Sequence, residues 1–169
     1  RGVPFGISES GYFAYDRHFN YQYRAFGVPG LGFQRGLEED LVTAPYATIM
    51  AMPFANRESM AALRRLERLG ARGKYGFYEA VDFTPKRLPQ GSKHVVIRSY
   101  MAHHQGMAFL TLANLLADRT MIDRFHSDKE VRAAELLLQE RVPARPAIIR
   151  HPALRRPHEP HERLLPGPG

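Results

Sequence analysis

The sequence between residues 56 and 70 constrains the fold most, because its apolar residues repeat at the spacing of one face of an α-helix. These residues are Met60, Leu63, Leu66 and Leu69. Side chains three or four positions apart share a helix face, so the segment predicts an amphipathic helix that buries this face. Asn56 can cap its start, and Gly70 is a typical C-terminal stop.

Four other stretches carry helical signals. Thr43 predicts an N-cap for a short helix that runs to about Met52, with Pro45 in its first turn. The apolar pattern from 97 to 117 predicts a buried helix, although Gly106 lies inside it. We expect Thr120 to cap a short helix that ends near His126, and Ser127 or Asp128 to cap a last helix that ends near Arg141.

The remaining segments show neither helical nor strand periodicity over any length. Residues 1–36 are rich in aromatic residues and glycine, with a turn expected at 28–32, and residues 74–89 contain Thr84-Pro85 and Leu88-Pro89. Both segments are predicted to be long loops. Long loops in a compact domain are uncommon unless they carry function. The predicted fold is therefore all-α, with helices joined by long aromatic-rich loops that carry the chemistry.

Composition limits the protein classes that remain. With 169 residues, 44% of them hydrophobic, the chain can bury one core. It contains no cysteine, which excludes disulfides, thiolate metal sites and cysteine nucleophiles. No apolar run approaches the roughly 18 residues that a membrane span needs. The chain starts at Arg1 without an initiator methionine, so we expect it to be a piece of a larger protein.

The formal charge of +7 raises the question of nucleic-acid binding. Residues 143–169 account for +3 of it and contain seven of the 13 prolines. Such a segment cannot bury enough apolar area to offset the cost of ordering, and it is predicted to be a Pro/Arg-rich interdomain linker. In residues 1–142 the basic residues alternate with acids, as on a solvated helix face. We therefore expect no nucleic-acid partner.

Two carboxylates lie in settings that suit sugar chemistry. Glu9 lies between Ser8 and Ser10 with aromatic residues nearby, and Glu79 lies in the stretch 75–80 among aromatic residues beside a glycine. Glycoside chemistry commonly uses two carboxyl groups, one of which protonates the leaving oxygen. Either acid can instead bond the loop backbone. The reserve candidates are Asp16, Glu38, Glu39, Asp40 and Asp82.

Histidines and aromatic residues supply further candidates. Consecutive His103 and His104 point about 100° apart on a helix, and no acid lies near them in the sequence, so we expect no metal there. With Gln105, they are candidates for hydrogen bonds to sugar hydroxyls. Arg24 can position a ligand or form an ordinary ion pair. The tyrosines that can stack on glucose rings, or pack in the core, are Tyr12, Tyr21, Tyr23, Tyr46, Tyr78 and Tyr100.

Five blocks of the sequence, in order, resemble the glycoamylase-like segment of bacterial cyclic β-1,2-glucan synthases. They are Gly6-Ile7-Ser8-Glu9-Ser10, the stretch 20–32, Ala44-Pro45-Tyr46-Ala47-Thr48, the stretch 75–80 and the stretch 99–107. Together they cover about residues 1–142, and Phe5 stands where the family usually has tryptophan. The resemblance implies that 1–142 is the C-terminal part of an α/α toroid.

The resemblance also implies a function. In that family the segment acts on linear β-1,2-glucan and cyclises it by retaining transglycosylation, without a cofactor. It supports catalytic roles for Glu9 and Glu79, of which we favour Glu9 as acid/base and Glu79 as nucleophile. The predicted substrate-binding residues are Tyr12, Tyr21, Tyr23, Arg24, Tyr78, His103, His104 and Gln105. The resemblance further implies a bacterial inner membrane protein, with this soluble domain on the cytoplasmic side between a glucosyltransferase and a phosphorylase-like domain.

Two other functions compatible with the sequence belong to different classes. In one, the acids and aromatic residues hold a glucan or a neighbouring domain without cleaving it, as a non-catalytic binding or packing module. In the other, the basic tail binds nucleic acid. The sequence leaves open which acid is the nucleophile, the ring size of the product and the activity of the chain alone.

Overall fold

The computed structural model describes residues 2–28, 36–37, 39–135 and 137–138. The predicted linker at 143–169, the reserve candidate Glu38 and most of the turn expected at 28–32 lie outside these residues. In chain order, the elements are β1 (Ser10–Tyr15), β2 (Tyr21–Arg24), β3 (Val42–Thr43), α1 (Pro45–Met50), α2 (Asn56–Arg68), β4 (Arg72–Gly73), β5 (Gly76–Phe77), β6 (Ala80–Asp82), the 3₁₀ helix η1 (Pro85–Arg87), β7 (Val95–Ile97), α3 (Ala102–Leu116), α4 (Thr120–Ser127) and α5 (Lys129–Glu135).

The prediction of an all-α fold, as part of an α/α toroid, is wrong. The described residues form a mixed α and β structure with three small antiparallel sheets, β1-β2, β3-β6-β7 and β4-β5. Both segments predicted as loops contain strands. Most of these strands have two to four residues, which is too short for an alternating pattern to show. The partners of β6 also come from distant segments, because Asp82 pairs with Val42 on one side and Val95 on the other.

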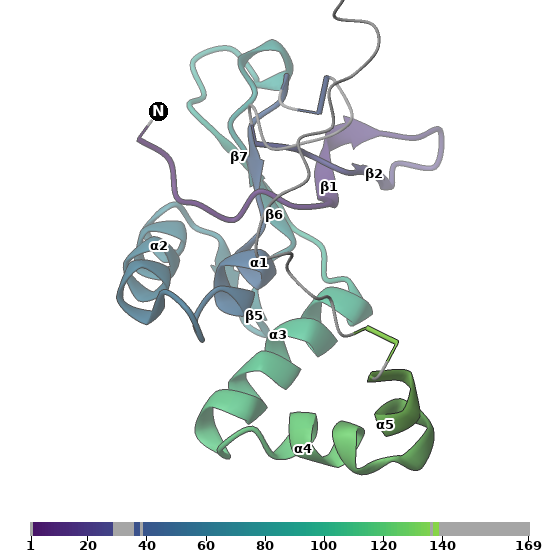
Figure 1. The fold of residues 1–169 in the computed structure, drawn as a ribbon. Coiled ribbons are helices and arrows are strands. Elements are labelled where there is room, and N and C mark those ends of the chain that lie inside the picture. Colours follow the sequence, from purple (N-terminus) through teal and green to yellow (C-terminus); the bar gives the residue numbers. More distant parts are fainter. Residues whose placement is uncertain (1, 29–35, 38, 136, 139–169) are drawn as a thin grey trace, which may run out of the picture.

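The hairpin β1-β2 and the three-stranded sheet together form one side of the molecule (Figure 1). Ser10 pairs with Arg24, and the register shifts between Tyr12 and Tyr15. At the hairpin tip the Asp16 carboxylate accepts hydrogen bonds from the backbone N–H groups of His18 and Asn20. β1 also packs on β6 and β7. The hairpin therefore brings residues near Ser10 against the sheet that contains Ala80.

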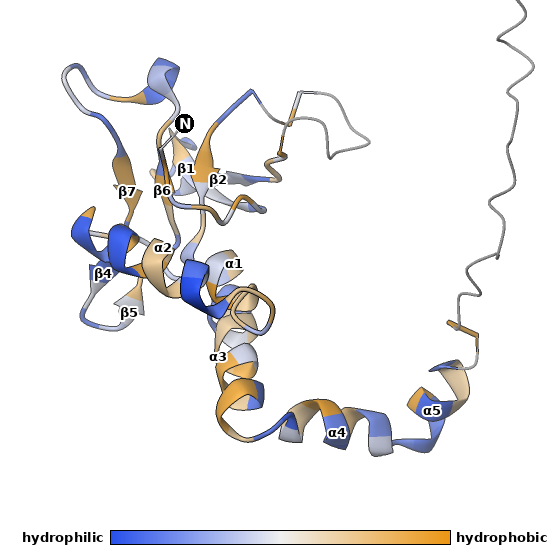
Figure 2. Cartoon of the chain, turned by 60° about the vertical axis from the view of Figure 1, so that its left-hand side comes forward, coloured by the Kyte–Doolittle hydropathy of each residue, from blue (hydrophilic) through white to orange (hydrophobic). Residues whose placement is uncertain are grey.

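Helices α1 and α2 build the main hydrophobic core. Leu63 and Leu66 of α2 are buried against α1 and the strands, and Met60 packs against this cluster, which confirms the predicted amphipathic helix. Figure 2 shows that hydrophilic and hydrophobic residues both occur along α2. The predicted caps are displaced by one residue, because the N-cap positions are Ala44 and Ala55 and neither makes a side-chain cap bond. Thr43 instead belongs to β3, where it pairs with Val81.

Helix α3 begins five residues later than the pattern suggested, because Val95–Ile97 pairs with β6 as β7. It is not the buried helix that was predicted, since only His104 and Ala108 of α3 are buried. Phe109 and Leu116 are strongly exposed, and Figure 2 shows the hydrophobic colouring of α3. Asp128 precedes α5 and accepts hydrogen bonds from the N–H groups of Glu130 and Val131, as predicted for a cap. None of the helices in the described residues could cross a lipid bilayer.

Candidate active site

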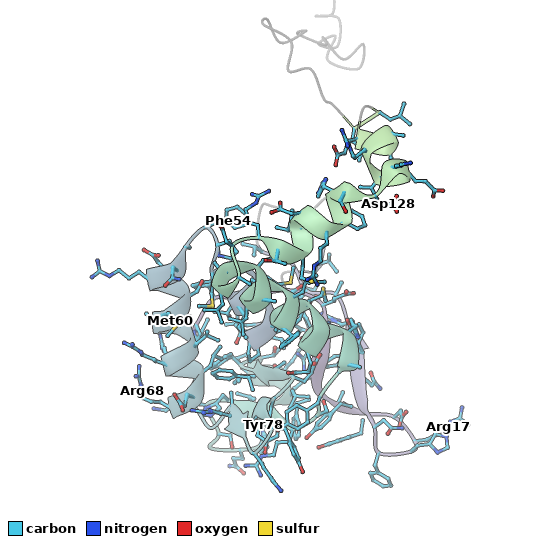
Figure 3. The ribbon with its side chains drawn as sticks, turned by 90° about the horizontal axis from the view of Figure 1, so that it is seen from below. Arg17, Phe54, Met60, Arg68, Tyr78 and Asp128 are labelled. Atoms are coloured by element: carbon cyan, nitrogen blue, oxygen red, sulfur yellow. The ribbon has the colours of Figure 1, made fainter. Side chains whose placement is uncertain are left out.

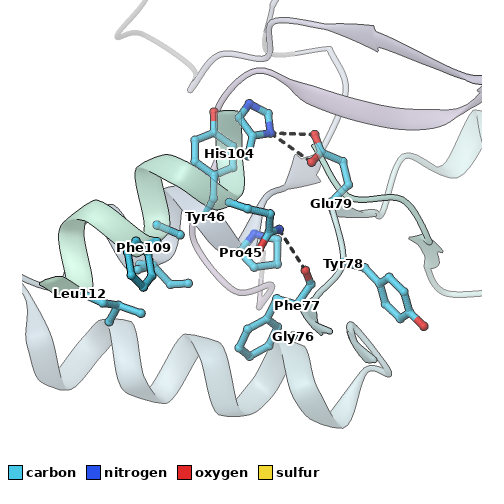
Figure 4. A pocket seen from close by; sticks show the side chains of 12 residues that line it. Pro45, Tyr46, Gly76, Phe77, Tyr78, Glu79, His104, Phe109 and Leu112 are labelled. Atoms are coloured by element: carbon cyan, nitrogen blue, oxygen red, sulfur yellow. Dashed lines mark hydrogen bonds and ion pairs between the residues drawn. The ribbon is translucent and has the colours of Figure 1, made fainter. Parts of the chain in front are cut away.

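A buried pair of side chains, Glu79 and His104, lies at the centre of the candidate site. Glu79 precedes β6, His104 lies in the first turn of α3, and their side chains are 0% and 1% exposed. His104 Nδ1 lies 2.9 Å from Oε1 and 3.1 Å from Oε2 of Glu79 (Figure 4). A carboxylate only accepts hydrogen bonds, so Nδ1 carries the hydrogen and Nε2 faces away from Glu79.

The hairpin supplies the second donor to Glu79. The backbone N–H of Gly11 in β1 lies 3.1 Å from Glu79 Oε1. A Cβ at position 11 would lie 3.3 Å from Glu79 Cγ and 3.2 Å from Ile97 Cγ2. The absent side chain of Gly11 therefore lets the strand approach the acid closely. Strand, sheet and helix meet at one carboxylate, which fixes their relative positions.

Two tyrosines enclose the His104 ring. Tyr46 of α1 stacks on it with ring centroids 3.7 Å apart and an interplanar angle of 11°. Tyr23 of β2 places its hydroxyl 3.2 Å from His104 Nε2 and 3.4 Å from His103 Nε2. Desolvation, with the negative charge of Glu9, raises the pKa of Tyr23 to about 12, and desolvation also raises the pKa of Tyr46. Both phenols therefore stay protonated at neutral pH.

Glu9 lies beside this cluster with an exposed side chain. One carboxylate oxygen of Glu9 and one ring nitrogen each of His103 and His104 all lie within 4.8 Å of one another. The Tyr46 hydroxyl donates to Ser8 Oγ at 2.8 Å and lies 3.1 Å from the Glu9 carbonyl oxygen, which anchors the segment before β1. The expectation that no acid completes a ligand set with the two histidines is therefore wrong, because folding brings Glu9 to His103 from 94 positions away in the sequence.

The fold brings five of the predicted site residues into one cluster, places Tyr78 and Gln105 in the lining of the adjoining pocket, and places the remaining three elsewhere. The cluster contains Glu9, Tyr23, Glu79, His103 and His104. Gln105 bonds the carbonyl oxygen of Phe77 at 3.4 Å. Tyr21 packs on Tyr15 in the hairpin, and Tyr12 donates to the Gln22 side chain. Tyr78 packs on Tyr100, with ring centroids 5.2 Å apart.

Arg24 belongs to a separate cluster of ion pairs. Of the two roles that the sequence left open for Arg24, ligand positioning and an ordinary ion pair, the structure shows the ion pair. Its guanidinium lies 2.6 Å from Asp40, whose buried carboxylate also pairs with Lys86 at 3.0 Å and Arg87 at 2.5 Å. Arg87 further pairs with Asp82. Desolvation acts to raise the pKa of Asp40, but hydrogen bonds from Arg87 and Lys86 outweigh it and hold the pKa below its ordinary value. The reserve candidates Asp40 and Asp82 therefore stabilise the sheet and the hairpin.

The reserve acid Asp16 caps the hairpin tip, where Arg17 projects away from the rest of the molecule (Figure 3). Tyr46, which the sequence offered only as one of six tyrosines that can stack on a sugar or pack in the core, is central to the cluster because its ring stacks on His104. Its sequence block was recognised, but nothing in it distinguishes a ring that stacks on histidine from any other tyrosine. A pocket of about 240 Å³ adjoins the buried pair, with a largely apolar lining that includes Phe77, Phe109 and Leu112 (Figure 4).

Comparison with known protein families places most of this chain in a glycoamylase-like domain. Residues 4–129 match the Glycoamylase family model, described as "Putative glucoamylase". The chain therefore belongs to this family, which confirms the resemblance seen in the motifs. It is also 48% identical over 142 residues to the "Cyclic beta-(1,2)-glucan synthase NdvB" of Rhizobium meliloti (strain 1021). The match covers 84% of this chain and 5% of that relative, so the chain spans a small part of the relative's length.

Proposed function

We propose that residues 1–142 belong to a carbohydrate-active domain that cyclises linear β-1,2-glucan by retaining transglycosylation. The cluster of Glu9, Glu79 and His104 carries this proposal, because it combines one exposed and one buried carboxyl group around a single imidazole. The similarity to a glucan synthase supports the choice of substrate. Residues 143–169 act as a linker to a further domain of a longer membrane-associated protein.

The reaction needs two events at the sugar. In a retaining transfer, a carboxylate attacks C1 while an acid protonates the leaving oxygen, and the C1–O bond breaks. A hydroxyl at the free end of the same glucan then attacks C1, releases the carboxylate and returns its proton to the base. The ring closes without consuming water.

The two acids differ in exposure, and this difference bears on which catalytic role each one takes. Glu9 is exposed and can exchange a proton with a sugar oxygen, which supports its predicted role as acid/base. The nucleophile role predicted for Glu79 requires its carboxylate to leave the hydrogen bonds of Gly11 and His104 and enter the solvent. We therefore propose that Glu79 holds His104 in the resting site, and that it attacks C1 as the nucleophile of the retaining step once its side chain leaves these hydrogen bonds.

The direct test uses the intact parent protein, linear β-1,2-glucan and mass analysis for cyclic product. Glu9→Gln should abolish ring formation, and Glu79→Gln should lower it by orders of magnitude and shift the pH profile of the remaining activity. Glu58→Gln is a matched control, because Glu58 is an exposed acid in the first turn of α2. Cyclic product at the wild-type rate from Glu9→Gln would remove Glu9 from the mechanism.

Azide rescue identifies the role of Glu9. In Glu9→Ala with an aryl β-linked donor, an acid/base role leaves the covalent intermediate intact, and azide then gives a β-glycosyl azide. A nucleophile role lets azide attack C1 from the opposite face and gives an α-glycosyl azide. The anomeric configuration, read by NMR, decides between the two roles.

A non-catalytic module remains the second candidate, and the buried state of Glu79 favours it. In that case, Glu9→Gln and Tyr23→Phe would weaken binding of linear β-1,2-glucan in parallel with any loss of ring formation. Retained binding with lost transfer supports catalysis instead. Affinity electrophoresis in gels that contain the glucan separates these outcomes.

A further inference from the structure

Three metal-binding side chains converge at the surface of the candidate site. Glu9 precedes β1, and His103 and His104 lie in the first turn of α3. Their nearest ligand atoms all lie within 4.8 Å of one another. The Tyr23 hydroxyl lies 3.2 and 3.4 Å from the two Nε2 atoms, so both nitrogens face the same point.

The buried part of the site fixes the geometry of one ligand. Glu79 accepts the Nδ1 hydrogen of His104, which leaves the Nε2 lone pair directed toward Tyr23 and Glu9. Histidines that bind metals almost always donate their other ring N–H to a carboxylate or a carbonyl in this way. The Tyr46 ring stacks on His104 and restricts its rotation. The tautomer and the ring orientation of His104 are therefore fixed in the way that is usual for a histidine that binds a metal.

The other two ligands can adjust. With bonds of about 2.0–2.2 Å to nitrogen and oxygen, the donors of a tetrahedral site lie roughly 3.4 Å apart. Closing from 4.8 Å requires a shift of about 1 Å, which the exposed side chains of Glu9 and His103 can provide by rotation. Two imidazoles and one carboxylate select late first-row divalent ions over Mg²⁺ and Ca²⁺, which prefer all-oxygen sites.

We propose that Glu9, His103 and His104 bind a late first-row divalent cation such as Zn²⁺, with Glu79 as the carboxylate that orients His104. Three protein ligands leave a fourth position for water or for the Tyr23 hydroxyl. Binding of the cation withdraws the Glu9 carboxylate from the sugar, so the metal inhibits ring formation. Only this inhibition rests on the proposed function, whereas the metal site stands on its own.

The test uses Co²⁺ as a spectroscopic probe and the full chain. Wild type should bind one Co²⁺ with the strong visible absorption of four- or five-coordinate cobalt, and Zn²⁺ but not Mg²⁺ should remove that absorption. His103→Ala and Glu9→Gln should each weaken binding at least tenfold, and Glu79→Gln by about 10–100-fold. His18→Ala is the matched control, because His18 is exposed at the hairpin tip and should leave binding unchanged.

Three further histidines, His151, His158 and His161, could bind cobalt independently. All variants are therefore also compared in a chain with these three replaced by alanine, and circular dichroism confirms that each is folded. Weak octahedral absorption only, or equal Co²⁺ affinity in wild type and His103→Ala, would overturn the proposed site. Tight Co²⁺ binding in a parent protein that forms no cyclic product would leave the site intact and refute the proposed function instead.

Discussion

Removal of the His104 side chain tests whether the buried Glu79–His104 pair stabilises the fold. His104→Ala deletes the donor that contacts both carboxylate oxygens and leaves Gly11 N–H as the remaining described donor to a fully buried carboxylate. Loss of the partner of a buried carboxylate leaves its charge uncompensated, which costs about 3–5 kcal/mol. At about 2–4 °C per kcal/mol for a chain of this size, the melting temperature should fall by about 6–20 °C.

A double-mutant cycle separates the pair from the loss of packing. Glu79→Gln keeps the shape and removes the charge, so it should cost about 1–3 kcal/mol. The double variant Glu79→Gln, His104→Ala should cost less than the sum of the singles by at least about 1 kcal/mol, because no unpaired carboxylate remains. Urea unfolding at pH 7, followed by circular dichroism, measures all four free energies.

The exposed neighbour His103 provides the matched control. His103→Ala removes an exposed imidazole one position away, whose described hydrogen-bond partner is Tyr23, and it should cost less than about 1 kcal/mol. The Glu79–His104 pair does not stabilise the fold if His104→Ala is no more destabilising than His103→Ala. Additive effects of Glu79→Gln and His104→Ala on the free energy of unfolding would likewise show that the two side chains do not interact.

Three further predictions concern other residues. The raised pKa of Tyr23, about 12, implies a contribution to the free energy of unfolding that is complete below pH 10 and lost as pH rises toward 12. Tyr23→Phe should therefore remove one late step from the titration of phenolate absorbance against pH. The lowered pKa of Asp40 implies a contribution that is complete above about pH 4 and lost as pH falls through the folded-state pKa, so Asp40→Asn should flatten the acid side of the curve of unfolding free energy against pH. Gly6→Ala should cost at least about 1–3 kcal/mol in urea unfolding, because Gly6 has φ of +128° and a Cβ there would lie 2.5 Å from Thr48 Oγ1. An unchanged absorbance titration, an unchanged acid slope or a neutral Gly6→Ala would each contradict the corresponding contact.

The helices were largely predictable because their signals are local. The face of α2 with Leu63 and Leu66, the first-turn Pro45 of α1 and the cap Asp128 all follow from residues within one or two helical turns. The strands were not predictable, since each is short and is stabilised by pairing with distant residues. Asp82, for example, pairs with Val42 and Val95 at the same time.

In the candidate site, too, some features follow from local sequence and others depend on contacts between distant residues. The sequence by itself determined the two carboxylates, the histidine pair and the family, because these depend on residue types in short ordered motifs. Only the tertiary structure decided which of them meet. It enclosed Glu79, exposed Glu9 and brought His104 between Tyr23 and Tyr46. Burial and hydrogen bonding between segments up to 95 positions apart set these environments, and no local pattern in the sequence encodes them.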